Sequence, residues 1–240
     1  ITVREKKMKR KNKSGEAAAI MAVFMFVLMF SGCDGESVRE QPAERENYTA
    51  RFCVVLDAGH GGVDGGALGI STGTRESEIN LAVTLKTGAL LESAGVRVVY
   101  TRKGEKSLCP DEQYNKKQDM RLRGQVIDAA RPDIVVSVHM NSYPDLRVRG
   151  AQTFYYPDSE CGKELAESIQ RSLKMADPKN RRTVKAEDFF LLRTYAGPSA
   201  LVECGFMTCP EEEKLLQKQE YQEKLAYCIF DGIMRYLMRP

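Results

Sequence analysis

Histidine is scarce in this chain, with two among 240 residues. Cysteine occurs seven times but never as a C-x-x-C pair. The odd number, and a length that allows a true apolar core, argue against a disulfide framework. We therefore expect mostly buried free thiols. No internal repeat is present either, so we expect a single domain rather than an array.

Signals for nucleotide and nucleic-acid binding are also missing. The glycine-rich run 59–66 lacks the Gly-Lys-Ser/Thr ending of a P-loop and the spacing of a dinucleotide fingerprint. Its glycines more simply let the backbone turn tightly around His60. Positive charge is concentrated in the first 16 residues, where 7 basic residues face 2 acidic ones, and the remaining 29 basic and 31 acidic residues give a net charge of −2. This balance excludes a basic surface for nucleic acid.

One long apolar run occurs, Ala17–Phe30, between a basic stretch and Ser31-Gly-Cys33. This order is typical of a secretory signal, and the run is shorter than the ~20 residues that a membrane span needs. Its end resembles a lipoprotein cleavage site, so a cleaved signal, an uncleaved anchor and a lipid on Cys33 stay open. We expect an exported protein, held at a membrane or secreted to the cell envelope. Residues 1–33 are the predicted signal or anchor, 34–50 a polar linker, and 51–240 the catalytic domain.

Strand-like and helix-like segments alternate from residue 51 onward. Predicted strands cover 53–56, 96–100, 134–138, 151–156, 189–192 and 200–202, and predicted helices cover 78–93, 117–130, 163–174 and 221–237. The alternation predicts an α/β domain with a mostly parallel twisted sheet of about six strands and helices on both faces. We expect Gly95 to end the first helix, Pro210 to begin another, and the charged stretch from Glu211 to Lys224 to be a solvated face.

Both histidines follow predicted apolar strands. His60 comes after 53–56, and His139 comes after 134–138. Side chains in these positions lie at the carboxyl edge of a parallel sheet, and histidine is the commonest metal ligand. A catalytic zinc site usually has a third protein ligand, often glutamate. Glu76 and Glu78 both lie where the next helix opens, and spacing alone does not choose between them. Glu203, at the end of 200–202, is a candidate general base.

Four segments carry a resemblance to a known family. They are V-V-L-D-A-G-H-G-G-x-D-G-G-A, R-E-S-E-I-N-L-A, V-S-V-H-M-N-S and A-L-V-E-C-G-F-M-T-C-P-E-E-E-K-L-L, in this order from residue 54. Together they resemble the zinc-dependent N-acetylmuramoyl-L-alanine amidases (amidase type 3) of bacterial cell walls. The departures, none of which removes a ligand, are Ser77, Met140, Cys204 and Cys209. Size and the segment 150–156 further resemble the short spore-cortex members.

The resemblance implies a role for each candidate. His60, Glu76 and His139 would bind Zn²⁺, and Glu203 would be the catalytic glutamate. The implied reaction is hydrolysis of the amide between N-acetylmuramic acid and L-alanine of the peptidoglycan stem peptide, in cell-wall or spore-cortex remodelling. Peptidoglycan is then the substrate, with the membrane contacted only through the amino-terminal segment. We expect a monomer, and the sequence leaves open whether an accessory protein is needed.

Three further residues have two interpretations each. Asp57 and Asn141 either orient the ligands or form turns. Arg193 either meets a substrate carboxylate or forms an ion pair with Glu203. In this family a helix can occlude the site, and the short polar stretch 175–188 predicts no such plug here. The alternative functions are a zinc peptidase or other amidohydrolase on this scaffold, and a non-catalytic wall-binding protein.

Overall fold

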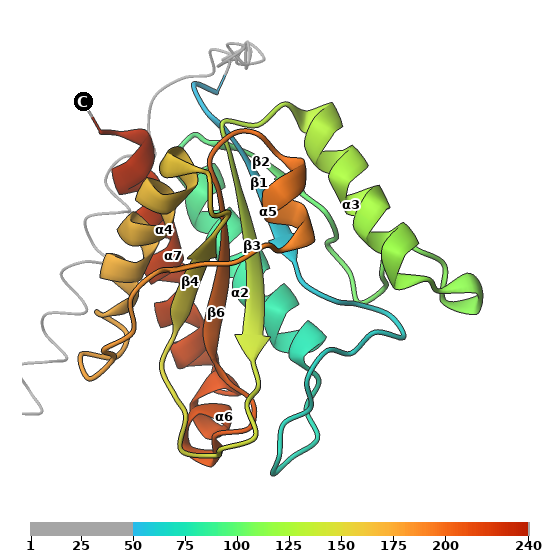
Figure 1. Cartoon of the computed structure of the whole chain (residues 1–240), viewed down its shortest axis with the longest axis vertical. Coiled ribbons are helices and arrows are strands. Elements are labelled where there is room, and N and C mark those ends of the chain that lie inside the picture. Colours follow the sequence, from blue (N-terminus) through green and yellow to red (C-terminus); the bar gives the residue numbers. More distant parts are fainter. Residues whose placement is uncertain (1–49, 240) are drawn as a thin grey trace, which may run out of the picture. The chain divides into compact units, whose positions relative to one another are not determined.

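A computed structural model describes residues 50–239, so the predicted signal or anchor and nearly all of the linker, including Cys33, lie outside the described residues. The described part is one α/β domain around a six-stranded sheet in the order β2-β1-β3-β6-β4-β5 (Figure 1). The strands are β1 Cys53–Ala58, β2 Arg97–Tyr100, β3 Ile134–Asn141, β4 Gln152–Tyr155, β5 Lys185–Ala186 and β6 Ser199–Phe206. The neighbours β2, β1, β3 and β6 are parallel, whereas β4 is antiparallel to β6. The predicted fold class is confirmed.

Helices cover both faces of the sheet. They are α2 Glu76–Ser93, α3 Lys116–Ala130, α4 Glu160–Leu173, α5 Phe190–Thr194, α6 Pro210–Leu216 and α7 Gln219–Leu237, with a short 3₁₀ turn η2 at Asp111–Gln113. The main core lies between the sheet and α2, α4 and α7, and a smaller core lies under α3 and α5 on the other face (Figure 1). No helix within residues 50–239 is both long and apolar enough to cross a membrane.

Strand alternation explains why the two faces differ. Val54 and Leu56 of β1 point into the main core, whereas Val55 joins the smaller one. Burying one such side chain contributes roughly 1.5–3 kcal/mol, so the large core on the α2 side supplies most of the stability. The next residue on the Val55 face is the buried Asp57. The apolar pattern therefore ends on this face just before the sheet edge, and polar groups take over.

Local signals account for most helix ends. Asn115 and Ser159 accept hydrogen bonds from the backbone N–H groups of Gln118 and Gly162, and so cap α3 and α4. Gly95, with φ of +78°, follows α2, as predicted. All six cysteines of the described residues are free thiols, and only Cys161 on α4 is partly exposed.

The predicted strand 189–192 is wrong, because Phe190–Thr194 forms the short helix α5. An apolar run of four residues does not distinguish the two structures. The edge strands of the sheet are β2 and β5, and this run pairs with neither of them. As a helix the run places Leu191 in the small core under α3, and Leu192 beside Phe154 of β4.

The prediction that the charged stretch from Glu211 to Lys224 is a solvated face is wrong for Glu212 and Glu213, although Glu211 and Lys214 are exposed and α6 does begin at Pro210. Glu212 and Glu213 are only 3% and 1% exposed. Glu212 accepts hydrogen bonds from the N–H groups of Gly150 and Phe206, at 2.9–3.1 Å. Glu213 accepts from the N–H groups of Ser71 and Thr72. The two carboxylates hold loops against the end of the sheet that carries the candidate site.

These contacts predict that replacing neighbouring glutamates by alanine lowers the stability of the domain by different amounts. Glu212→Ala leaves two buried N–H groups without an acceptor and should lower the free energy of unfolding by about 2 kcal/mol. Glu211→Ala, at an exposed position of the same helix, should cause no measurable loss. Denaturant titration of both variants checks this, and equal losses would contradict the structural role of Glu212.

Candidate metal centre

Three parallel strands bring the candidate residues to one edge of the sheet. His139 of β3 is the register partner of Glu203 on β6, and His60 lies two residues beyond the end of β1. Gly59 is required here, because a Cβ on it would lie 2.2 Å from Cε1 of His139. The glycine therefore makes room for the His139 ring over the end of β1, in addition to the tight turn that the sequence predicted.

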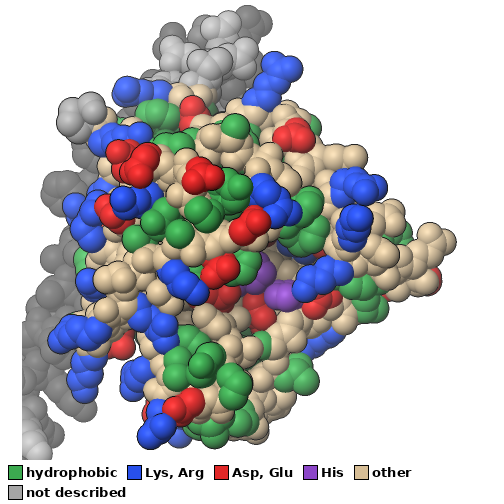
Figure 2. Space-filling view, in the orientation of Figure 1, with side chains coloured by type: hydrophobic (Ala, Val, Ile, Leu, Met, Phe, Trp, Pro, Cys, Tyr) green, Lys and Arg blue, Asp and Glu red, His purple; other side chains and the backbone are tan. Residues whose placement is uncertain are grey.

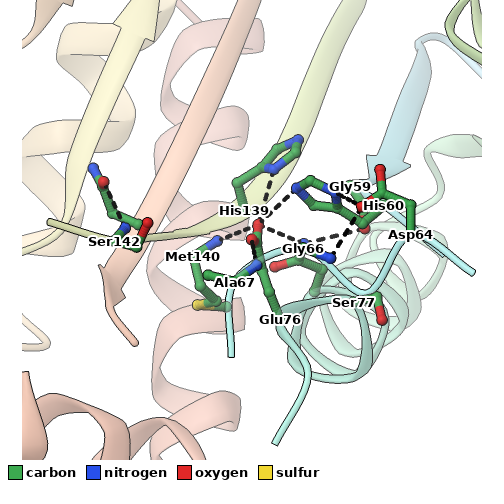
Figure 3. A network of polar contacts seen from close by, with 12 residues as sticks. Gly59, His60, Asp64, Gly66, Ala67, Glu76, Ser77, His139, Met140 and Ser142 are labelled. Atoms are coloured by element: carbon green, nitrogen blue, oxygen red, sulfur yellow. Dashed lines mark hydrogen bonds and ion pairs between the residues drawn. The ribbon is translucent and has the colours of Figure 1, made fainter. Parts of the chain in front are cut away.

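His60, Glu76 and His139 converge, each with one ligand atom within 4.8 Å of the others (Figure 3). Nε2 of His60 lies 3.3 Å from Oε1 of Glu76, and Nδ1 of His139 lies 3.0 Å from the same oxygen. Glu76 is the first residue of α2 and is buried, whereas Glu78 is exposed. The structure thus brings Glu76, and not Glu78, to the two histidines.

The Glu76 carboxylate is fixed on every side (Figure 3). Its Oε2 accepts a hydrogen bond from Ala67 N, and its Oε1 accepts from Met140 N and from the Asn80 side chain, at 2.8–3.1 Å. Burial raises its pKa, but hydrogen bonds with His139 and His60 outweigh burial and hold the pKa well below its usual range. The group is therefore an ionised carboxylate held in a fixed position at neutral pH, as a ligand of a divalent cation must be.

Asp64 lies beside the His60 ring, a position that the sequence interpretation missed. Its Oδ1 lies 2.9 Å from Nδ1 of His60, and its Oδ2 accepts a hydrogen bond from the Tyr114 hydroxyl. A carboxylate on one ring nitrogen directs the other toward a metal. The signal was present in the sequence, as the one acid within the glycine run that follows His60.

Two buried arginines hold the His60 loop, and they too were missed. His60 has a left-handed backbone, with φ of 62°. Arg123 donates to the carbonyls of Ala58 and His60, while Arg102 donates to those of Ala58 and Gly59. The nitrogen of Arg102 that binds Gly59 O also binds Ser77 O, each at 2.9 Å. One guanidinium therefore joins the residue before His60 to the residue after Glu76.

The two residues with a predicted orienting or turn-forming role differ in what they contact. Asp57 accepts hydrogen bonds from Thr101, Ser137 and Arg123, borders the same cavity as His60 and His139, and holds the His60 loop through Arg123. Asn141 accepts a hydrogen bond from the next backbone N–H, which fits its turn-forming interpretation.

Arg193 forms its ion pair with Asp188, at 2.6 Å, so the predicted pair with Glu203 is wrong. Glu203 lies on β6, whereas Arg193 lies on α5. The Arg193 side chain is exposed, at the end of a helix that the sequence had predicted as a strand. Its other interpretation, contact with a substrate carboxylate, stays a prediction.

The Glu203 side chain lies beside His60, Glu76 and His139 and forms no hydrogen bond or ion pair within the described residues. Its Oε2 is buried and has no hydrogen bond within the described part of the chain. Burial raises the pKa of Glu203 to about 7, opposed by the nearby His139 and reinforced by the negative charge of Glu76. A carboxyl group with such a pKa can both accept and donate a proton near neutrality.

The site opens into a cavity of about 320 Å³. His60, His139 and Glu203 line one part, and the apolar side chains of Met120, Phe189 and Phe190 line another. The histidines are visible in a hollow of the molecular surface, bordered by acidic and basic side chains (Figure 2). Two histidines and a glutamate placed for a metal, with a second glutamate beside them at the carboxyl edge of an α/β sheet, are typical of metal-dependent hydrolases.

The chain matches the family described as N-acetylmuramoyl-L-alanine amidase over residues 54–235. The germination-specific N-acetylmuramoyl-L-alanine amidase of Bacillus subtilis (strain 168) is 31% identical over 222 residues, which cover 90% of each chain. The CwlD amidase from Clostridioides difficile, solved in complex with the GerS lipoprotein, is 41% identical with a TM-score of 0.74, covering 78% of this chain and 98% of that one. The catalytic domain of CwlV, an N-acetylmuramoyl-L-alanine amidase from Bacillus (Paenibacillus) polymyxa var. colistinus, is 29% identical with a TM-score of 0.69 at the same coverage.

The chain therefore belongs to the N-acetylmuramoyl-L-alanine amidase family. The predicted family and enzyme class are confirmed, and the predicted likeness to spore-cortex members agrees with the germination-specific relative.

Because both histidines converge on Glu76, we expect Glu76 and Glu78, at the start of α2, to differ in their effect on zinc binding. Glu76→Ala removes an oxygen that faces both histidines and should reduce the zinc content of protein purified with zinc to a small fraction of one ion per chain. Glu78→Ala, the matched control, should leave zinc content unchanged because its side chain is exposed. Elemental analysis of the two proteins gives the answer, and the reverse result would mean that the carboxylate ligand is wrongly assigned.

The environment of Asp57 predicts that the stability of the domain decreases at acid pH. Burial raises its pKa, but the Arg123 charge and hydrogen bonds from Ser137 and Thr101 lower it from 3.8 to about 2. Because the folded value lies below the unfolded one, this stabilisation is complete above about pH 4 and is lost as pH falls toward 2. The free energy of unfolding of the wild type should therefore fall over that range. In Asp57→Asn this fall should be smaller by about 2 kcal/mol. Denaturant titrations at stepped pH test this, and a wild-type slope in the variant would contradict it.

Proposed function

We propose that this enzyme hydrolyses the amide bond between the lactyl group of N-acetylmuramic acid and L-alanine of the peptidoglycan stem peptide, with zinc as its cofactor. The observation that carries the proposal is the position of Glu203. It lies in register with His139, and its unpartnered carboxylate oxygen is buried beside the group formed by His60, Glu76 and His139.

The donor set supports zinc as the metal. Two histidines and one glutamate are a standard ligand set for catalytic zinc, and they leave a position free for water or substrate. His60, Glu76 and His139 would hold the ion, with Asp64 orienting the first of them. Bound zinc supplies Lewis acidity, which polarises the scissile carbonyl and makes a water molecule acidic near neutral pH.

Glu203 supplies the proton transfers in this proposal. As a general base it removes a proton from the attacking water, and as a general acid it later gives that proton to the nitrogen of L-alanine as the C–N bond breaks. Its position on β6, next to the fixed strand β3, holds the carboxylate without help from a mobile loop. The products are muramic acid with a free lactyl carboxylate and a stem peptide with an alanine amino terminus.

The relatives support the substrate and the setting. The germination-specific amidase of Bacillus subtilis supports a role in the spore wall, and therefore action outside the cytoplasmic membrane. We also propose that residues 1–33 direct export or anchoring and that 34–50 link them to a catalytic domain from residue 51. The complex of the Clostridioides difficile amidase with a lipoprotein supports an accessory partner of that kind. Lipidation of Cys33 and a monomeric state stay predictions.

The assigned role of Glu203 predicts a separation of metal binding from turnover. Glu203→Gln keeps the shape of the side chain but cannot accept a proton, so it should retain full zinc content and lose at least about 100-fold in kcat. Zinc analysis and release of soluble peptides from purified peptidoglycan measure the two properties. Loss of zinc in this variant would mean that Glu203 is a ligand instead.

Product analysis distinguishes the proposed reaction from the other candidates. Only the amidase frees intact stem peptides that begin with L-alanine, whereas a peptidase cuts within the stem and leaves alanine attached to the glycan. Removal of zinc with a chelator should abolish the release, and adding zinc back should restore it. A purified protein that binds peptidoglycan, takes up no zinc and releases nothing would be a wall-binding protein.

A further inference from the structure

One charged side chain in the catalytic cavity has no assigned role. Lys116 lines the cavity together with His60, His139 and Glu203, and it forms no ion pair or hydrogen bond within residues 50–239. Apart from Glu203, the other charged groups of the lining are engaged. Arg123 pairs with Asp57 and Asp119, and Asp64 lies against His60. Lys116 is thus the unmatched cation of the cavity lining.

Helical spacing explains why Lys116 faces the cavity and its neighbour does not. The residues of α3 that line the cavity are Lys116, Asp119, Met120 and Arg123. They lie three, four and seven residues apart and therefore share one face of the helix. Lys117, which is also exposed, is not among them. The chain therefore provides two adjacent lysines of equal chemistry, of which one borders the cavity.

The proposed substrate carries an anion close to the bond that is cut. In the peptidoglycan stem, L-alanine is followed by D-glutamate linked through its side chain, whose α-carboxyl group is either free or amidated. This group lies about one extended residue, roughly 3.5 Å of chain, beyond the alanine whose amide is cut. A peptide bound with its scissile bond at Glu203 therefore carries the carboxyl group within the same cavity. A lysine ammonium binds a carboxylate and gains little from a neutral amide.

We propose that Lys116 binds the α-carboxylate of the glutamate that follows L-alanine, and that the enzyme therefore prefers stem peptides with a free carboxylate over amidated ones. This inference rests on the proposed function and names a specificity determinant for it. Met120, Phe189 and Phe190 would pack against the apolar parts of the same segment. The binding is charge-assisted and partly open to water, so a preference of about tenfold is expected.

The test compares two substrates that differ only in this group, N-acetylmuramoyl-L-alanyl-D-glutamate and its α-amide, N-acetylmuramoyl-L-alanyl-D-isoglutamine. Wild-type enzyme should show about tenfold higher kcat/KM for the acid, mainly through KM. Lys116→Met should bring the ratio close to one, Lys116→Glu should reverse it, and Lys116→Arg should keep it. Lys117→Met, the matched control, should behave like wild type. A change in folding alone would lower the rates on both substrates together and leave the ratio intact.

Two results would overturn the inference. One is a wild-type enzyme with equal kcat/KM for acid and amide, and the other is a Lys116→Met variant that keeps the wild-type ratio. Turnover of neither substrate would count against the proposed function instead. In that case the affinities of L-alanyl-D-glutamate and its α-amide for wild type and for Lys116→Met test the inference separately. Tighter binding of the acid that disappears in the variant supports Lys116 as the carboxylate site, and equal binding refutes it.

Discussion

The candidate site depends on how the backbone of residues 58–60 is held. Three consecutive carbonyl groups accept hydrogen bonds from the guanidinium groups of Arg102 and Arg123. The left-handed conformation of His60 costs energy, and these bonds stabilise it. Asp57 and Asp119 in turn neutralise Arg123. Removing one member of such a buried pair typically costs 3–5 kcal/mol, because the remaining charge is left uncompensated. The geometry of the histidines is therefore maintained by the whole network beneath them.

The sequence predicted the parts of this arrangement that short-range patterns encode. His60, His139 and Glu203 each end an apolar strand, and parallel strands present their ends at one edge, so their proximity followed from the α/β pattern. Glu76 was different, because spacing left Glu78 equally eligible and only the family resemblance selected it. The arginines could not be found this way. Arg102 and Arg123 contact carbonyls that are 43 to 65 residues away in the chain, and no local pattern distinguishes them from exposed arginines.

Two of the wrong predictions have a common cause. The acidic run at 211–214 looked like a solvent-facing surface, but loops from distant parts of the chain bring unpaired N–H groups to Glu212 and Glu213. The apolar run at 189–192 looked like a strand, but it packs as a helix against the small core under α3 and against Phe154 of β4. In both cases the local composition was interpreted correctly, and the outcome was decided by which partner the rest of the fold placed beside it. Tertiary context overrides propensity most readily in segments as short as these.

The cysteines have a practical consequence for studying the domain in solution. Of the six thiols in residues 50–239, five are buried and one, Cys161, is accessible at the start of α4. This helix covers the face of the sheet opposite α3, away from the catalytic cavity (Figure 1). A thiol-reactive fluorophore or spin label would therefore attach at one position without mutagenesis. Such a label could report the tumbling of the domain, and hence its capture by an insoluble polymer, while the site itself stays unmodified.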